Sequence, residues 1–247
     1  MIFTIAHKEF RSLFATPSTW LILGALQFIF AWFFLARLDA FLQVQAQLSQ
    51  IANAPGATLA VAAPLFGTLA LILMMLVPVF TMRLFAEERR NQTLVLLMTA
   101  PISGMHIVLG KFFGLMLFLL LIVASCTLMV LSLAAGTQLD TGLLLSNALG
   151  LLLLAASYTA LGLYISVLTA QPVVAAISAL AALFGLWLVE VSAVDADTAW
   201  RMFAPTSHFQ SFNIGLPNSA DMVYFALFIV SFLMLTIRRI HTNRVYS

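Results

Sequence analysis

Charged side chains are scarce in this 247-residue sequence. Asp, Glu, Lys and Arg make up 8% of it, whereas about a quarter of the residues in an ordinary soluble domain are charged. Hydrophobic residues make up 63%, and the mean hydropathy is +1.08. A soluble chain of this length cannot bury so much apolar surface, so part of it must face lipid. The composition predicts an integral membrane protein without a separate soluble enzyme domain.

Cysteine is almost absent, and the common catalytic motifs are missing. The single cysteine, Cys126, excludes a disulfide framework and a CxxC-type zinc site. Gly104 and Gly110 are one residue too far apart for a phosphate-binding loop, and Phe112 follows Lys111 where that loop needs Ser or Thr. The histidines are scattered, and neither a paired-carboxylate pattern nor a basic tract for nucleic acid occurs. We therefore expect no catalytic, metal-binding or nucleotide-binding residue.

Long apolar runs predict an all-α protein with six membrane spans. A helix needs about 20 apolar residues to cross a hydrocarbon core of about 30 Å. Residues 37–61 are instead rich in Gln and contain the breaker Pro55-Gly56, so we interpret them as a loop with a short helix. In a single transmembrane domain, 1–247, the predicted spans are residues 17–36, 62–82, 112–135, 143–168, 173–189 and 222–237.

Residues 1–16 combine apolar and charged side chains at helical spacing. The apolar residues lie on one side of the predicted helix, and Lys8, Glu9, Arg11 and Ser12 lie on the other. We expect an amphipathic helix in the membrane interface. A secretory signal is the alternative, but no Lys or Arg precedes Lys8 and the charges interrupt the apolar run.

Ionisable residues are missing from the interior of the predicted spans, and Glu190 stands at the end of one. Ion-driven carriers and proton relays place such groups at mid-membrane depth. If this chain transports a substrate, its energy therefore comes from another source. The natural source is a cytoplasmic ATPase that acts on residues 83–111.

The stretch 83–111 is the longest break between the apolar runs. It begins with a charge cluster, continues as a helix-like segment to Met98, and turns at Thr99-Ala100-Pro101. We expect Glu88 at the start of that short helix, where the helix dipole stabilises a carboxylate by about 0.3–1 kcal/mol. The charge cluster consists of Glu87, Glu88, Arg89 and Arg90.

Three leucines of the same stretch, Leu94, Leu96 and Leu97, are too apolar for a freely solvated loop. They predict either docking into a groove of a partner protein or contact with the membrane surface.

The distribution of Lys and Arg predicts the orientation of the chain. With 83–111 in the cytoplasm, only Arg37 and Arg201 lie near the outer ends of spans. The positive-inside rule then places both termini in the cytoplasm. The basic residues on that side are Lys8, Arg11, Arg83, Arg89, Arg90, Lys111, Arg238, Arg239 and Arg244.

Small and polar residues inside the spans predict close helix packing. Gly110 and Gly114 form a GxxxG pattern where the third span begins. Substrate contact is the alternative for the polar residues, but Ser and Thr also bond the backbone of their own helix. These residues include Ser125, Thr127, Ser157, Thr159, Gly162 and Ser166.

The loop 83–111 also carries a family pattern. An acid and Arg precede Thr-Leu, a leucine pair, Pro-Ile-Ser and Gly-Lys, which resembles the cytoplasmic loop of the permease subunits of ABC-2 type exporters. Gln92 and Val95 stand where that family usually has Gly and an acid. The matching residues are Glu88, Arg90, Thr93, Leu94, Leu96, Leu97, Pro101, Ile102, Ser103, Gly110 and Lys111.

The two ends of the chain extend the resemblance. The N-terminal HKEFRSLFATP looks like the connecting helix that precedes the first span in this family. The C-terminal part looks like the gliding-motility-type branch. Its matching residues are Pro205, His208, Phe209, Phe212, Gly215, Asp221, Tyr224 and Phe225, followed by Arg238 and Arg239.

The resemblance implies a type V exporter-like fold in the bacterial cytoplasmic (inner) membrane. The permease would pair with a second copy or a sister permease and with two nucleotide-binding ATPase subunits. Those subunits would bind ATP and Mg, so this chain would carry no cofactor and would not be an enzyme by itself. The implied ATPase-coupling residues are Glu87, Glu88, Arg90, Thr93, Leu94, Leu97 and Pro101.

The resemblance also implies that residues 190–221 fold back into the outer leaflet as a lid. The segment is amphipathic, and Pro205, Gly215 and Pro217 break it into short pieces, which supports this interpretation. The implied lid residues are Pro205, His208, Phe209 and Gly215.

Two other classes of protein remain open. A membrane anchor or force-transmitting scaffold for an ATPase would use the same loop. An intramembrane enzyme is disfavoured, because no nucleophile, base or metal cluster lies at depth. The substrate is not predicted.

Overall fold

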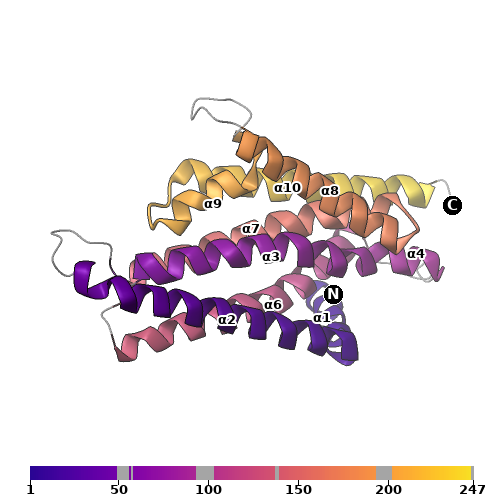
Figure 1. The fold of residues 1–247 in the computed structure, drawn as a ribbon. Coiled ribbons are helices and arrows are strands. Elements are labelled where there is room, and N and C mark those ends of the chain that lie inside the picture. Colours follow the sequence, from indigo (N-terminus) through magenta and orange to yellow (C-terminus); the bar gives the residue numbers. More distant parts are fainter. Residues whose placement is uncertain (49–55, 57, 93–102, 137–138, 193–201, 246–247) are drawn as a thin grey trace.

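The protein is an all-helical bundle. The computed structural model describes residues 1–48, 56, 58–92, 103–136, 139–192 and 202–245 (Figure 1). Every regular element in these ranges is a helix, and six helices are long and apolar enough to cross a membrane. The predicted fold class, an all-α membrane protein with six spans, is therefore confirmed.

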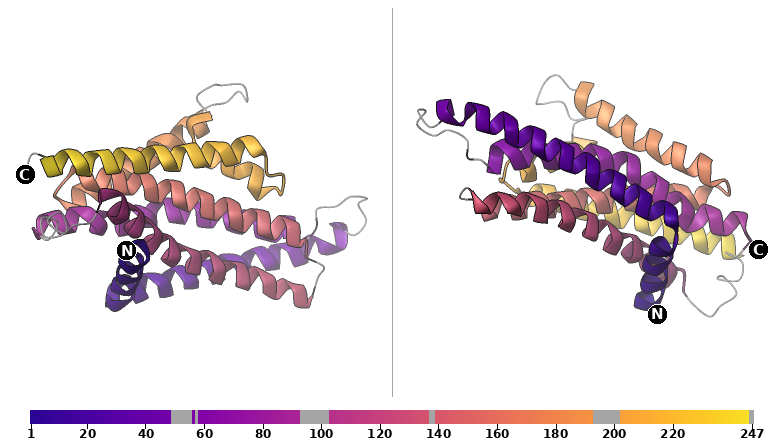
Figure 2. Two further views of the ribbon diagram at one scale, coloured as in Figure 1. Left: turned by 180° about the vertical axis from the view of Figure 1, so that it is seen from behind. Right: turned by 60° about the horizontal axis from the view of Figure 1, so that its bottom comes forward.

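The six helices that are long enough to cross a membrane run along the bundle axis in alternating directions (Figures 1 and 2). The first part of the chain forms α1 (Ile2–Ala15), α2 (Pro17–Leu48), η1 (Thr58–Ala62), α3 (Ala63–Met82), η2 (Arg83–Glu87) and α4 (Glu88–Arg90). The remainder forms α6 (Gly104–Leu131), η3 (Ser132–Ala135), α7 (Thr141–Leu168), α8 (Pro172–Ser192), α9 (Pro205–Asn213) and α10 (Ser219–Val245).

A short helix, α1, lies across one end of the bundle at a steep angle to α2 (Figure 2). The helix stops at Thr16, whose backbone is extended, as expected for the residue before a proline. The hydroxyl of Thr16 donates a 2.9 Å hydrogen bond to the carbonyl of Leu13, and the indole of Trp20 donates one of 2.9 Å to the carbonyl of Phe14. Both bonds satisfy carbonyls at the end of α1 and fix the corner into α2.

The helix α2 is longer than the sequence indicated. Residues 37–48, which we expected to be mostly loop, continue the helix without a break. Gln, Ala and Leu are good helix formers, and the side-chain amide of Gln43 donates a 3.0 Å hydrogen bond to Asp39 one turn earlier. The polar residues of this segment indicate where the chain leaves the hydrocarbon core of the membrane. They do not mark the end of the helix.

The charged break between the second and third spans is shorter than expected. Residues 83–90 continue α3 through one π-helical turn, and α6 already begins at Gly104. No proline or glycine interrupts 83–90, and its Arg, Glu and Ala residues favour a helix. Within the described residues, only Asn91, Gln92 and Ser103 are left between the two helices.

The central helix of the bundle is α7, which contacts α3, α6, α8, α9 and α10. Small residues on α7 let its neighbours come close. A Cβ atom added to Gly162 would lie 2.9 Å from Cβ of Thr81 on α3, and one added to Gly150 would lie 2.8 Å from Cγ of Phe212 on α9. The core therefore consists mainly of α3, α6 and α7, and large apolar faces of α2, α8 and α10 remain uncovered.

The contact at Gly162 predicts a stability effect. The substitution Gly162→Ala should force α3 and α7 apart and destabilise the protein by about 1–3 kcal/mol, as overpacking does in cores. We expect a lower midpoint of thermal unfolding in detergent. Gly185→Ala on α8 is the control, because no atom lies within 4 Å of an added Cβ there. Equal midpoints for the two variants would contradict this packing.

Candidate functional site at the α4 end of the bundle

The two ends of the bundle differ in composition. Figure 1 shows α1, α4 and the C-terminal end of α10 at one end, which we call the α4 end, and α9 near the opposite end, the α9 end. The charge cluster of residues 87–90 therefore lies beside both termini of the chain. The first and the last helix meet at the same end of the bundle because the chain crosses it an even number of times.

The charge cluster lies at the end of a helix. Glu88 is the first residue of the short helix α4, but α4 has no free N-terminus, because residues 58–90 form one continuous helical segment and Glu88 lies in its last turn. The predicted stabilisation of Glu88 by the positive end of a helix dipole is therefore wrong. The negative end of a helix dipole disfavours a carboxylate and favours the neighbouring Arg89 and Arg90. Another partner must therefore stabilise Glu88.

The four charged residues face different directions. Glu87 and Arg90 are exposed, whereas Glu88 and Arg89 are partly buried. The guanidinium of Arg89 donates a 3.1 Å hydrogen bond to the carbonyl of Val167 in the last turn of α7, where a cation is favoured. Glu88 points the other way, toward α6.

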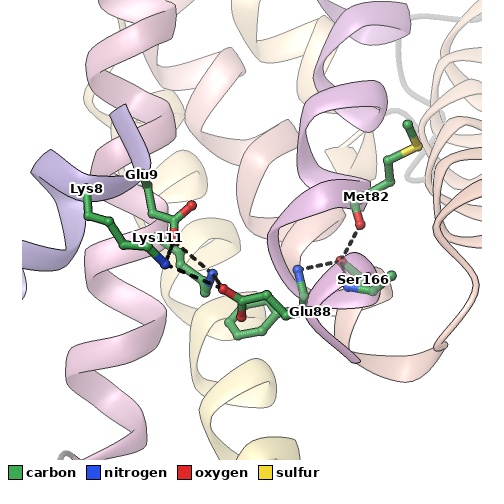
Figure 3. Close-up of polar contacts among 8 residues, drawn as sticks. Lys8, Glu9, Met82, Glu88, Lys111 and Ser166 are labelled. Atoms are coloured by element: carbon green, nitrogen blue, oxygen red, sulfur yellow. Dashed lines mark hydrogen bonds and ion pairs between the residues drawn. The ribbon is translucent and has the colours of Figure 1, made fainter. Parts of the chain in front are cut away.

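Lys111 is the partner of Glu88. Its ammonium group lies 2.7 Å from Oε1 of Glu88 on α4 and 3.0 Å from Oε1 of Glu9 on α1 (Figure 3). The side chain of Lys111 is 1% exposed, and those of Glu9 and Glu88 are 11% and 20% exposed. The ammonium also lies 5.2 Å from the ring centroid of Phe85, within range of a cation–π contact. We call Lys111, Glu9 and Glu88 the Lys111 cluster.

A fourth charge, Lys8, borders this cluster. Its ammonium lies 3.5 Å from Glu9 and 4.0 Å from Glu88, but its side chain is 67% exposed. Exposed ion pairs contribute about 0–1 kcal/mol. Removing one member of a buried pair costs about 3–5 kcal/mol, because the remaining charge is left without compensation. The buried member, Lys111, therefore determines the strength of the cluster.

The position of Glu9 differs from the sequence prediction. We expected Glu9 on the polar side of α1, but it is buried with Ala6 and Leu13, one face of the helix. The spacing of the apolar residues gave no indication of this, because the partner lies 102 positions later in the chain. The signal that could have revealed this position was Lys111, because this lysine lies two turns inside a helix that begins at Gly104. Such a lysine requires a buried anion.

The predicted packing residues Gly110 and Gly114 lie beside Lys111 on α6, against α1. An added Cβ would lie 2.7 Å from Cβ of Ile5 at Gly110 and 2.8 Å from Cβ of Glu9 at Gly114. Larger residues at these positions would displace α1, and with it the carboxylate of Glu9.

On the other side of the same helical turn, α7 holds the π-helix η2. The hydroxyl oxygen of Ser166 accepts hydrogen bonds from the backbone N–H groups of Phe85 (3.3 Å) and Ala86 (3.1 Å). The same hydroxyl donates a 3.4 Å bond to the carbonyl of Met82 (Figure 3). A π-helical turn leaves backbone groups poorly paired, and Ser166 supplies partners for them.

Four of the predicted coupling residues lie outside the described residues. They are Thr93, Leu94, Leu97 and Pro101. Of the others, Glu87 and Arg90 are exposed at the α4 end, and Glu88 is held inside the Lys111 cluster.

The predicted lid residues lie at the α9 end. Pro205 occupies the first turn of α9, and Phe209 is buried in the core. Gly215 has a φ of +79°, which requires glycine, and an added Cβ would also approach Leu143 on α7. The hydroxyl of Ser146 on α7 donates a 2.9 Å bond to the carbonyl of Phe212.

His208 joins α9 to α10. Its Nδ1 lies 2.6 Å from Oδ1 of Asp221, its Nε2 lies 3.0 Å from the carbonyl of Met202, and its ring stacks on Tyr224 at 3.9 Å. Both ring nitrogens thus lie within hydrogen-bond distance of an oxygen atom. The hydroxyl of Tyr224 donates a 2.7 Å bond to the carbonyl of Phe203, and Thr206 donates one to Glu190 on α8.

Polar residues inside the spans mostly bond their own helices. The hydroxyls of Ser125, Thr127, Ser157 and Thr159 each donate to a carbonyl three or four residues earlier, as expected. The hydroxyl oxygen of Ser125 also lies 3.3 Å from Oε1 of Gln27 on α2. These residues are therefore explained without a bound substrate.

The six spans, the helix across the α4 end and the helical pieces at the α9 end define a multi-pass helical membrane protein. The family model described as ABC-2 family transporter protein matches residues 3–241, so the chain belongs to this family of ABC transporter permeases. No curated protein matches the chain significantly.

The Lys111 cluster predicts a large difference between two lysines. Lys111→Met should destabilise the protein by about 3–5 kcal/mol, because Glu9 and Glu88 are left without the buried cation. Lys8→Met, the control, should change stability by about 0–1 kcal/mol. The measurement is the thermal unfolding midpoint in detergent, and similar midpoints for both variants would contradict the cluster. Adding Glu9→Gln and Glu88→Gln to Lys111→Met should restore much of the loss.

Proposed function

We propose that the chain is the permease subunit of an ATP-binding cassette exporter. It moves a substrate outward across the bacterial cytoplasmic membrane, driven by ATP that two separate nucleotide-binding subunits bind with Mg and hydrolyse. The observation that carries this proposal is the geometry of residues 87–90. Glu87 and Arg90 face solvent at the end of the bundle, while Glu88 and Arg89 anchor the same turn to α1, α6 and α7.

This arrangement suits a docking element that also transmits force. Two exposed charges of opposite sign provide directional contacts for a partner protein. The residues between them hold the turn against the spans, so a displacement by the partner reaches the bundle. We propose that Thr93, Leu94, Leu97 and Pro101 belong to the same docking element.

The distribution of ionisable residues supports an external energy source. The middle third of each of the six spans contains no Asp, Glu, Lys, Arg or His. Lys111, which lies two turns inside α6, is neutralised by two carboxylates and is not positioned to carry ions.

The uncovered helices support further partners. The spans α2, α8 and α10 bury the smallest shares of their residues. We propose that membrane lipid and a second permease, a copy or a sister chain, cover these faces.

The rival function is a non-transporting scaffold for the same ATPase, and substrate-stimulated ATP hydrolysis by the reconstituted complex distinguishes the exporter from it.

The docking proposal predicts the effect of a charge exchange. Glu87→Lys combined with Arg90→Glu should abolish copurification of the co-expressed ATPase and the ATP hydrolysis that depends on the permease. Both residues are exposed, so expression and thermal unfolding should remain normal. Glu88→Lys is unsuitable for this test, because it would place a second cation beside the buried Lys111.

The control is Arg239→Glu, which reverses an exposed charge on α10. It should leave the complex intact. If the 87/90 double variant keeps both the ATPase and its activity, the docking element lies elsewhere.

The orientation follows from the proposal that the α4 end is cytoplasmic and that residues 190–221 form the outer lid. In a Cys126→Ser background, single cysteines at the exposed positions Asn91 and Thr242 should resist a membrane-impermeant thiol reagent in intact cells. Cysteines at Gly56 and Leu216, which are also exposed, should react. Reaction of Asn91→Cys from outside would refute the orientation.

A further inference from the structure

Three helices that are separate in the sequence share the single buried ammonium of Lys111. It belongs to α6, and its two carboxylate partners belong to α1 and α4 (Figure 3). We infer that α1, the end of α4 and the beginning of α6 move as one rigid body, with Lys111 as the positioning residue that makes α1 part of the coupling device. This inference rests on the proposed function, in which an ATPase displaces α4.

The contact between α1 and α6 leaves no room for sliding. Gly110 and Gly114 bring the backbones so close that the carbonyl of Ala6 would lie 2.9 Å from a Cβ at position 114. Between the two glycines, Lys111 reaches Glu9 on α1. The close packing at the two glycines and the ion pair therefore hold α1 and α6 in the same register.

The contact between α6 and α4 depends on charge. Apolar surfaces hold helices together without direction, so they permit small sliding movements at little cost. An ion pair in a region of low dielectric has a defined geometry, and separating it leaves two uncompensated charges. Glu88 and Lys111 therefore resist displacement of α4 relative to α6 more strongly than an apolar contact of the same size.

A movement of α1 is also passed on to α2. Thr16 alone separates the two helices, and Trp20 in the first turn of α2 is hydrogen-bonded to Phe14 in the last turn of α1. A rotation of α1 must therefore move the start of α2. This span is among the two least buried of the six, so the bundle itself offers it little resistance.

The experiment measures the distance between α1 and α4 in the assembled complex with the ATPase in lipid nanodiscs. Spin labels are attached to Ser12→Cys on α1 and Asn91→Cys after α4, both exposed, in a Cys126→Ser background. Distance distributions are recorded without nucleotide and after trapping with ATP and vanadate. The comparison is between the intact cluster and a neutral variant, Glu9→Gln, Glu88→Gln and Lys111→Met, which removes the ion pairs without leaving a buried charge.

With the intact cluster, we expect one narrow distribution that is the same in both nucleotide states. In the neutral variant, trapping should shift or broaden the distribution, and the permease-dependent ATP hydrolysis, measured without vanadate, should be lower than in the intact protein. Arg11→Met removes an exposed cation from α1 outside the cluster and should behave like the intact protein.

Two results would overturn the inference. A shift with the intact cluster would show that α1 and α4 move separately. An unchanged narrow distribution in the neutral variant would show that the cluster is not the link. Failure of the ATPase to copurify with the intact protein is a different result, which contradicts the proposed function and the inference with it.

Discussion

A lysine ammonium buried two turns inside α6 needs anions, and much of the α4 end follows from that requirement. Two glutamates supply them, one from α1 and one from the last turn of the segment that contains α3 and α4. Each glutamate brings its helix to a fixed position. Glu88 would be unfavourable at a helix C-terminus without this cation, and Glu9 would be unfavourable on a buried helix face. Each of the three charged residues would destabilise the fold without its partners, and together they stabilise one another. The relative position of the three helices is therefore specific.

The remainder of the bundle depends on close packing around α7. Glycines at 150 and 162 admit Phe212 and Thr81. The hydroxyls of Ser157 and Thr159 bond to the backbone of α7 itself, so they do not keep the helices apart. Charges are restricted to the two ends. At the α9 end, His208, Thr206 and Tyr224 tie the short helix α9 and the residues before it to α8 and α10. The middle of the bundle is apolar, and α2, α8 and α10 leave large apolar faces uncovered.

The sequence predicted the six spans and the amphipathic N-terminal helix, because apolar runs and helical spacing are local properties. It did not predict where the helices end. Apolar runs report the thickness of the hydrocarbon, whereas residues 37–48 and 83–90 are polar yet rich in helix formers. The Lys111 cluster was missed for a different reason. Its members are separated by up to 102 positions, and each resembles an ordinary surface charge until the helix boundaries show that Lys111 lies inside α6.

The burial of Glu9 also changes the role of α1. An interfacial helix that only floats on the membrane turns an apolar face toward the lipid and its charges toward water. In α1 the face formed by Ala6, Glu9 and Leu13 packs on protein and contains a carboxylate, whereas Phe3 remains exposed. A carboxylate on that face would weaken simple membrane binding, so its place is explained by Lys111 and not by lipid. The helix is therefore docked on α6 in one register, which the ion pair and the close packing define.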